Sequence, residues 1–225
     1  MKYFLSFILI GIASFSYGQK FTISPTVQLA VPQGDYKETN PDAGYGLRVN
    51  FLYRPGKSRF VKFGGEFGMQ EKARATQYFS GYVNGFYDEF KVSATSNIFS
   101  LMFLTRFRPN TFHKVKPFVD LTAGWNVFFS TVTVERLTFY SDYNNSYSNS
   151  TKAHWAFSYG AAGGIDIPLN GRDDLGLELK VAYIIGANTT YLTDPYIGND
   201  AKVSFIERTS RTNMLIPQAG IRINL

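Results

Sequence analysis

Few residues in this sequence have the types and spacing that catalysis or metal binding would need. Cysteine is absent, so thiolate metal sites and disulfides are excluded, and histidine occurs only as His113 and His154. A hydrolytic site needs a nucleophile beside a base, and the candidates near His154 are Ser158 and Asp142. Nothing in their spacing sets a nucleophile against a base. We therefore expect no enzymatic activity and interpret His154 as a polar residue at the end of a strand.

Candidate sites for ions, phosphates and nucleic acids are equally weak. Asp194, Asn199 and Asp200 carry oxygen atoms suited to Ca²⁺, but their spacing matches no calcium-binding loop. The stretch 160–164 is as glycine-rich as a phosphate loop, yet it lies in mid-strand with no helix after it. The formal net charge of +6 comes from basic residues dispersed along the chain. The sequence therefore predicts no cofactor, no metal and no nucleic-acid partner.

A regular alternation of apolar and polar residues organises the chain instead. In the C-terminal stretch 213–225, Leu215, Ala219 and Ile223 share one face, while Gln218 and Arg222 share the other. The same period predicts further strands at 21–31, 43–54, 61–70, 93–108, 117–134, 153–167 and 175–186. The connections between them are alternately long and short, with long ones at 71–92 and 188–212. Eight such strands with this asymmetry are typical of membrane β-barrels.

A barrel of eight strands could face lipid, or it could face water and carry a ligand inside. The positions of glycine distinguish the two, because glycine weakens a strand on a wide surface but fits a narrow lumen. Gly64, Gly124 and Gly164, like most strand glycines, share the polar parity, and large residues such as Phe103 and Trp125 share the apolar one. The sequence therefore predicts an all-β fold, an eight-stranded antiparallel up-and-down transmembrane β-barrel.

With the polar parity inward, the lumen would contain charges of both signs. Such charges are tolerated in a low-dielectric interior when they are paired. We expect a lumen charge network that plugs the barrel, although a polar path for a small solute is the alternative. Its predicted members are Arg48, Lys62, Glu66, Arg106, Asp120, Glu178, Lys180 and Arg222.

The amino terminus has the pattern of a cleaved signal peptide. Lys2 precedes the apolar run 3–13, and the small residues Ser16 and Gly18 suit a cleavage site. The run is too short to cross ~30 Å of hydrocarbon as a helix. We predict a signal peptide at 1–18 and a barrel domain at 19–225.

These features together resemble the small outer-membrane β-barrel proteins of Gram-negative envelopes, and in particular the porin-family or PorT-like group. The most specific resemblance is to the family's C-terminal assembly signal, whose positions are occupied by Gln218, Gly220, Ile223 and Leu225. The resemblance implies an integral outer-membrane location and recognition by the barrel-assembly machinery. Pro25 and Pro217 depart from a regular strand pattern, and we predict that each lies at a bulge or faces a gap in the ladder.

The expected function is a non-enzymatic barrel that holds long extracellular loops for binding or envelope integrity. The alternatives are an accessory subunit of an outer-membrane secretion or uptake assembly, and an enzyme that modifies lipid A. Expected partners are outer-membrane lipid, lipopolysaccharide attracted by loop cations such as Arg74 and Arg208, and a protein that binds the loops. The loop residues proposed for contact are aromatic: Tyr78, Phe79, Tyr82, Phe86, Tyr87, Tyr191 and Tyr196.

Overall fold

The chain folds into strands along almost its whole described length. The computed structural model describes residues 20–55, 60–83, 86–109, 115–137, 146–151, 153–169, 174–198 and 202–225. The elements are β1 (Lys20–Pro32), α2 (Asp35–Thr39), β2 (Gly44–Arg54), β3 (Val61–Val83), β4 (Phe86–Phe107), β5 (Lys116–Arg136), β6 (Ser146–Ser150), β7 (His154–Pro168), β8 (Leu175–Gly186), β9 (Asn188–Ile197), β10 (Val203–Arg211) and β11 (Met214–Asn224). The predicted signal peptide, 1–18, lies outside the described residues.

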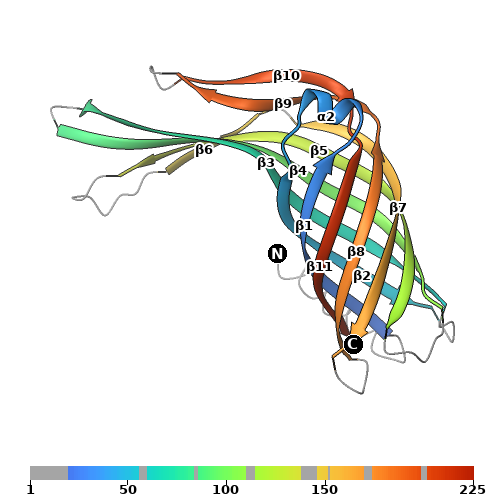
Figure 1. Cartoon of the computed structure of the whole chain (residues 1–225). Coiled ribbons are helices and arrows are strands. Elements are labelled where there is room, and N and C mark those ends of the chain that lie inside the picture. Colours follow the sequence, from blue (N-terminus) through green and yellow to red (C-terminus); the bar gives the residue numbers. More distant parts are fainter. Residues whose placement is uncertain are drawn as a thin grey trace, which may run out of the picture.

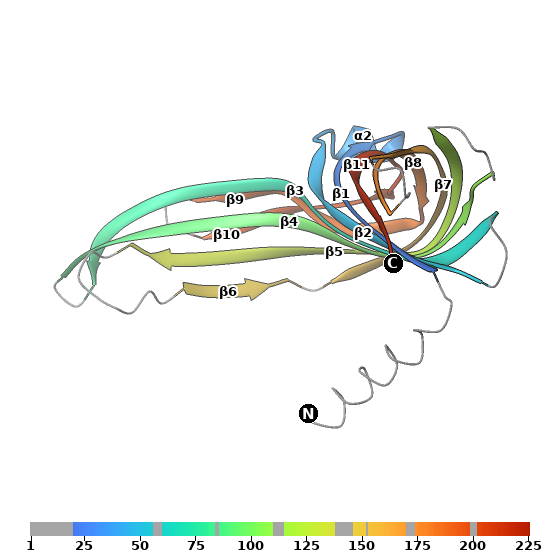
Figure 2. The same cartoon turned by 90° about the horizontal axis from the view of Figure 1, so that it is seen from below.

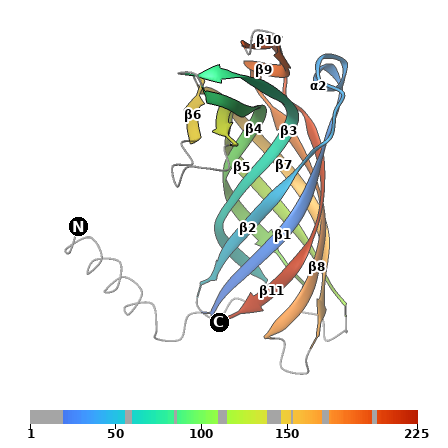
Figure 3. The ribbon, with the colours of Figure 1, turned by 90° about the vertical axis from the view of Figure 1, so that its left-hand side faces the viewer.

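Eight strands close into a ring. β1 pairs with β2, and antiparallel pairing continues through β3, β4, β5, β7 and β8 to β11, which pairs back onto β1. The strands run obliquely around the barrel (Figures 1 and 3). The prediction of an eight-stranded antiparallel up-and-down barrel is confirmed.

The two faces of the barrel wall differ in the predicted sense. Large apolar side chains such as Phe103, Val119 and Trp125 are exposed on the outside, whereas Asn50 and Asp120 are fully buried inside. An apolar exterior around a polar interior is the reverse of a soluble carrier and is the arrangement of a barrel inserted in a bilayer. Among the described residues, no helix combines the length and the apolar character needed to cross a membrane.

Several strands continue far beyond the barrel, which corrects the predicted connection at 71–92. β3 and β4 remain paired in that interval up to the pair Val83 and Phe86, with a single register shift at 71–73. The aromatic residues of this segment have high strand propensity, and β5 and β6 extend the sheet, so the ladder does not end at the barrel rim. We call the sheet formed by 73–83 of β3, 86–96 of β4, 130–136 of β5 and β6 the wing.

The last long connection, predicted as a loop at 188–212, is also a sheet. β9 and β10 form a separate antiparallel hairpin, and β9 contacts β3, β4, β5 and β7. The wing leaves the barrel sideways, and β9 and β10 cover one of its faces (Figures 1 and 2). The end of the barrel that carries these elements is called the wing end below.

The two prolines lie along one seam of the ring. The β1–β11 ladder keeps a constant register, but it has no pair at Pro25 and none at Pro217. Both residues retain a register partner in the other neighbouring strand, Val49 of β2 and Val181 of β8. The prolines therefore face gaps in the ladder rather than bulges, one of the two arrangements predicted. The seam joins the first and last strands of the barrel.

Candidate functional site

The centre of the lumen is occupied by a guanidinium held between two carboxylates. Arg106, on β4, places Nε 2.8 Å from Oδ1 and Nη2 2.9 Å from Oδ2 of Asp120 on β5. It also donates to Glu178 on β8, with Nη1–Oε2 at 2.8 Å and Nη2–Oε1 at 2.9 Å. All three side chains are buried. Paired, bidentate geometry of this kind is what makes a buried charge tolerable.

A second set of charges extends this cluster across the barrel. Lys180 places Nζ 2.5 Å from Oε2 of Glu66 and 3.6 Å from Oδ2 of Asp120, and Arg48 forms a buried ion pair with Glu66. With Arg106 and Glu178 this makes three cations and three carboxylates. We call these six residues the ionic cluster. Its opposite charges are equal in number, so it adds no net charge to the barrel centre.

Glycines provide the space that the ionic cluster occupies. A Cβ atom on Gly68 would lie 2.9 Å from Nε of Arg48. One on Gly164 would lie 2.3 Å from Cζ of Phe118, whose ring centroid is 3.7 Å from the guanidinium carbon of Arg106. The inward glycines therefore lie directly against the large side chains that fill the lumen, as expected for a narrow barrel.

The remaining predicted lumen residues lie toward the short-connection end. Arg222, fully buried on β11, lies 3.6 Å from Asp166, which also pairs with Arg108 at 3.1 Å. Lys62 Nζ donates to Thr22 Oγ1 at 2.7 Å. The structure thus places all eight predicted lumen residues inside the barrel.

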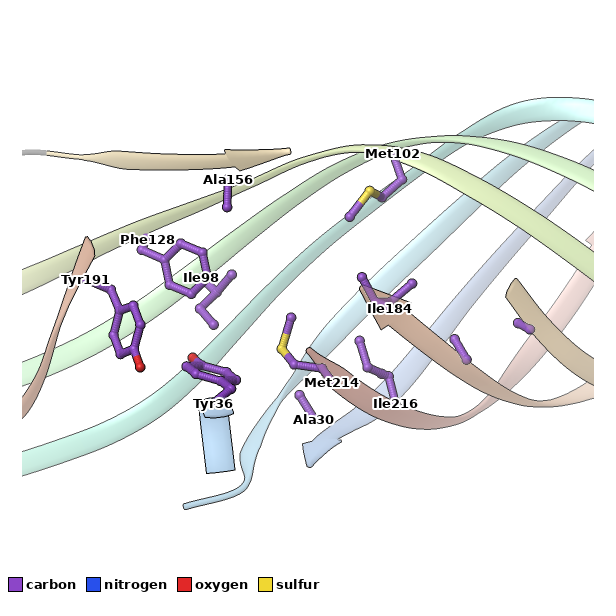
Figure 4. Packing of buried hydrophobic residues seen from close by; sticks show 12 residues of the cluster. Ala30, Tyr36, Ile98, Met102, Phe128, Ala156, Ile184, Tyr191, Met214 and Ile216 are labelled. Atoms are coloured by element: carbon purple, nitrogen blue, oxygen red, sulfur yellow. The ribbon is translucent and has the colours of Figure 1, made fainter. Parts of the chain in front are cut away.

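A cluster of apolar side chains lies toward the wing end of the lumen, beside buried polar residues such as Gln70, and the sequence analysis missed it. Ile98, Met102, Ile184, Ile216 and Met214 belong to one buried cluster, which we call the apolar layer (Figure 4). These residues share the inward parity with the charges, and the sequence analysis assigned no apolar cluster to that parity. The signal was their clustering near one end of several strands.

Three aromatic rings lie over this apolar layer and close the mouth of the barrel. Tyr36 of α2 meets Phe128 of β5 and Tyr191 of β9 edge to face, with centroids 6.4 and 5.2 Å away, and all three rings lie together in Figure 4. Tyr191 Oη lies 2.6 Å from Thr39 Oγ1 and 2.9 Å from Ser210 Oγ. Burial raises the pKa of the Tyr36 phenol, so this hydroxyl stays neutral. We call Tyr36, Phe128 and Tyr191 the aromatic lid.

The predicted loop contacts separate into exposed and buried residues. Tyr78 on the wing is 66% exposed and Tyr196 on β9 is 65% exposed, whereas Tyr191 is 1% exposed and belongs to the lid. The prediction that Tyr191 is exposed is therefore wrong, because β9 folds back over the barrel mouth. Phe79 is half-buried. The side chains of Tyr82, Phe86 and Tyr87 lie outside the description, although Tyr82 pairs with Tyr87 at the end of the β3–β4 ladder.

Three of the predicted assembly-signal residues lie on β11, on both of its faces, and Leu225 directly follows the strand. Gln218 is buried beside Thr26, whose Oγ1 lies 3.4 Å from its Oε1, and Gly220 lies so close to β1 that a Cβ atom would be 2.1 Å from the Pro25 carbonyl oxygen. Ile223 and Leu225 are exposed on the outside. Their role in recognition by the assembly machinery stays a prediction.

Of the residues considered for catalysis, Ser158 is held by hydrogen bonds inside the barrel. Ser158 Oγ is buried, accepts from Asn126 Nδ2 at 2.9 Å and lies 3.4 Å from the Ala156 carbonyl oxygen. Asp142, His113, Asn199 and Asp200 lie outside the described residues. Within the described part of the chain, no group of three or more His, Cys, Asp or Glu side chains is arranged to hold a metal ion.

A cavity of about 730 Å³ lies between the barrel rim and the β9–β10 hairpin, with Asp42, Lys72, Asp194, Tyr196 and Ile206 among its lining residues. Lys72 donates to the Asp42 carbonyl oxygen, and its ammonium lies 5.0 Å from the Tyr36 ring centroid. Burial lowers the pKa of Lys72 to about 8, while the Asp42 and Asp194 carboxylates act in the opposite direction. Asp194 has a φ of 46°, a backbone conformation uncommon for a residue with a side chain. Lys72 and α2 thus connect this cavity to the lid.

Comparisons with known proteins find similarity among solved structures only. No protein-family model matches the chain, and no curated protein matches its sequence. The chain is similar to Neisserial surface protein A, to a major outer membrane protein from Thermus thermophilus and to the outer membrane protein OprG from Pseudomonas aeruginosa. The identities are 13%, 10% and 14%, and the TM-scores are 0.44, 0.47 and 0.46. The matches cover 92%, 93% and 92% of this chain and 96%, 100% and 95% of the other chains.

Proposed function

We propose that this small eight-stranded β-barrel is an outer-membrane protein that acts as a non-enzymatic, non-conducting anchor and presents the wing outside the cell for binding. The observation that carries this proposal is the filling of the lumen. The ionic cluster occupies its centre, and an apolar layer under the aromatic lid occupies the wing end. An eight-stranded barrel has room for side chains but little more.

The orientation follows from the lengths of the connections. Outer-membrane barrels have short turns on the periplasmic side and long loops outside. In this chain α2, the wing and the β9–β10 hairpin all lie at one end, and the connections between β2 and β3, β4 and β5, and β7 and β8 are short. The wing end is therefore assigned to the exterior. Lipopolysaccharide and a protein partner are the ligands proposed for it, and the barrel-assembly machinery acts on β11 during insertion.

Two other functions receive less support. Lipid A modification needs a reactive nucleophile near the membrane surface, whereas Ser158 is buried and hydrogen-bonded to Asn126 inside the barrel. An accessory role in a secretion or uptake assembly remains compatible with the wing, because a projecting sheet offers exposed side chains such as Tyr78 to another protein. In that case the barrel would still act as the anchor.

Conductance measurements test the anchor role. Purified protein inserted in planar bilayers is expected to give no steady channel. Phe128→Ala combined with Ile98→Ala removes bulk from the aromatic lid and from the apolar layer beneath it. This comparison variant should conduct more than the wild type if these two sets of side chains help to close the lumen. A steady, large conductance of the wild-type protein would overturn the proposal, as would a lipid A profile that changes when the protein is deleted.

A further inference from the structure

We propose that the uncovered face of the wing is a second membrane-contact surface, which lies on the phosphate and sugar head groups of the outer leaflet beside the barrel. This inference rests on the proposed function, because it needs the barrel to be inserted with the wing end outside. The inference assigns a ligand, the lipid head groups, to the face of the wing that β9 and β10 do not cover.

The uncovered face is an ordered array of hydroxyl groups. One row across the four strands consists of Arg74, Thr95, Thr131 and Ser150, and the next consists of Thr76, Ser93, Thr133 and Ser148. A third row begins with Tyr78, Lys91 and Glu135. The Thr76 and Ser93 hydroxyls lie 3.3 Å apart, as neighbours on one face should. With strands ~4.8 Å apart, each full row is ~14 Å long.

This face is continuous with the lipid-facing surface of the barrel. Along β4 the outward positions change from Phe103, Leu101 and Phe99 in the barrel to Thr95 and Ser93 in the wing. Along β5 they change from Trp125 and Phe129 to Thr131 and Thr133. The change coincides with the rim, where β2 stops pairing with β3 at Glu71 and β7 stops pairing with β5 at Phe128. An apolar surface that becomes hydroxylated at the rim matches the passage from acyl chains to head groups.

The opposite face of the wing is already covered. Val92, Ala94 and Ser130 point to that side and are buried, and β9 contacts β3, β4 and β5. Figure 1 shows β9 and β10 on the side of the wing that faces away from the barrel's other end, and Figure 2 shows the wing reaching out sideways. The hydroxyl face is therefore turned toward the plane of the membrane around the barrel.

The chemistry of the face suits head groups better than hydrocarbon or a strongly acidic partner. Hydroxyls donate to phosphate oxygens and both donate to and accept from sugar hydroxyls. The charged groups of the array are largely neutralised in place, since Arg74 pairs with Glu71 at 2.6 Å and Lys91 pairs with Glu135 at 2.9 Å. Many hydrogen-bonding groups with little net charge favour a glycolipid layer that carries both phosphate and sugar.

Single-cysteine labelling tests the proposal, and the absence of native cysteine makes the labelling specific. Ser148→Cys places a fluorophore on the hydroxyl face, Thr209→Cys places one on exposed β10, and Val119→Cys places one on the barrel exterior. The protein is reconstituted in vesicles of lipopolysaccharide and phosphatidylethanolamine, and quenching by aqueous iodide is compared with that in detergent micelles. Label 148 should show a several-fold lower quenching constant in vesicles, and label 209 should show no change.

The accessibility of label 119 to iodide distinguishes a failure of the head-group inference from a failure of the proposed anchor function. If label 119 is protected and label 148 is as accessible as label 209, the head-group surface is refuted while the anchor stands. If label 119 is also accessible in vesicles, the anchor itself is refuted. Protection of label 148 in intact cells but not in these vesicles would overturn the inference in favour of a protein that covers the face. As a second variant, Thr76→Val combined with Thr133→Val keeps side-chain volume and should raise quenching of label 148, whereas Thr190→Val with Thr209→Val should not.

Discussion

Arg106 and Glu178 lie on strands that are not neighbours in the ring, and they meet across the lumen through two hydrogen bonds of 2.8 and 2.9 Å. Because β4 and β8 share no ladder, this pair links opposite walls of the barrel. The same guanidinium holds Asp120 on β5, so three strands depend on one side chain.

Removing that guanidinium should strongly destabilise the barrel. Arg106→Met leaves the buried carboxylate of Glu178 without its main partner, which typically costs ~3–5 kcal/mol. Arg106→Met combined with Glu178→Leu should recover part of the loss, because Lys180 remains 3.6 Å from Asp120. Urea unfolding in lipid vesicles, followed by tryptophan fluorescence, measures both. Lys91→Gln, at an exposed ion pair, is the control and should leave the unfolding free energy unchanged. An unchanged unfolding free energy for Arg106→Met would show that the ionic cluster does not hold the barrel together.

Two adjacent glycines should respond oppositely to the same substitution. Gly164 points inward, where a Cβ atom would lie 2.3 Å from Phe118 and 2.7 Å from the Leu179 carbonyl oxygen, whereas Gly163 points outward with nothing within 4 Å. Gly163→Ala should be neutral or stabilise by ~0.4–1 kcal/mol through the unfolded chain. Gly164→Ala should destabilise or slow assembly, as measured by the same urea titration and by the fraction folded after refolding. Equal effects would refute the claim of a tightly filled lumen.

The stability of the wing end should rise with pH above about 8. Lys72 has a folded pKa of about 8 against an ordinary lysine value of 10.5, so between these values the unfolded chain binds the proton and the folded protein does not. Proton loss therefore favours the folded state, and the gain is complete near the unfolded pKa. Lys72→Met should flatten this pH dependence of the unfolding free energy. If the unfolding free energy of the wild type instead falls between pH 8 and 10.5, and that of Lys72→Met stays constant, burial does not lower the pKa of Lys72.

Hydrogen exchange should be fastest along the proline seam. The β1–β11 ladder lacks pairs at Pro25 and Pro217, whereas the β7–β8 ladder is continuous from Ser158 to Pro168. Local opening is easier where ladder hydrogen bonds are missing. Mass-resolved exchange in detergent should therefore show faster deuterium uptake in peptides covering 22–31 and 214–223 than in 158–168. Equal uptake would mean that contacts inside the lumen, rather than the ladder, hold the seam.

The sequence specifies the barrel well but specifies the wing and the aromatic lid poorly, for a physical reason. Period-two alternation reports which face of a strand meets lipid, so the eight barrel strands and the inward positions of Arg48 and Asp120 could be predicted. In the wing both faces meet polar or mixed surroundings, and the alternation weakens around Ser93 and Thr131. The β3–β4 hairpin of the wing is local in sequence, so the weak alternation, rather than a distant partner, hides its length.

The fate of Tyr191 illustrates the same limit within the lid. Its neighbours Thr190 and Leu192 give no sign that β9 folds back onto the barrel mouth, and Tyr196, a few residues later, is exposed as predicted. Burial of Tyr191 depends on Tyr36 and Phe128, which come from two remote segments. A single sequence can therefore suggest that aromatic residues gather outside the membrane, without indicating which of them pack together.

These two tyrosines provide a matched test of the lid. Tyr191→Ala removes a buried ring and its contacts with Thr39 and Ser210, and large-to-small changes of this kind typically cost ~3–5 kcal/mol. Tyr196→Ala removes an exposed ring and should leave stability unchanged. Thermal unfolding in detergent, read by near-ultraviolet circular dichroism, compares the two variants, and Tyr191→Phe separates the hydroxyl contacts from ring packing with an intermediate loss of ~1 kcal/mol. Equal melting temperatures for both alanine variants would show that the barrel mouth is not held closed by Tyr191.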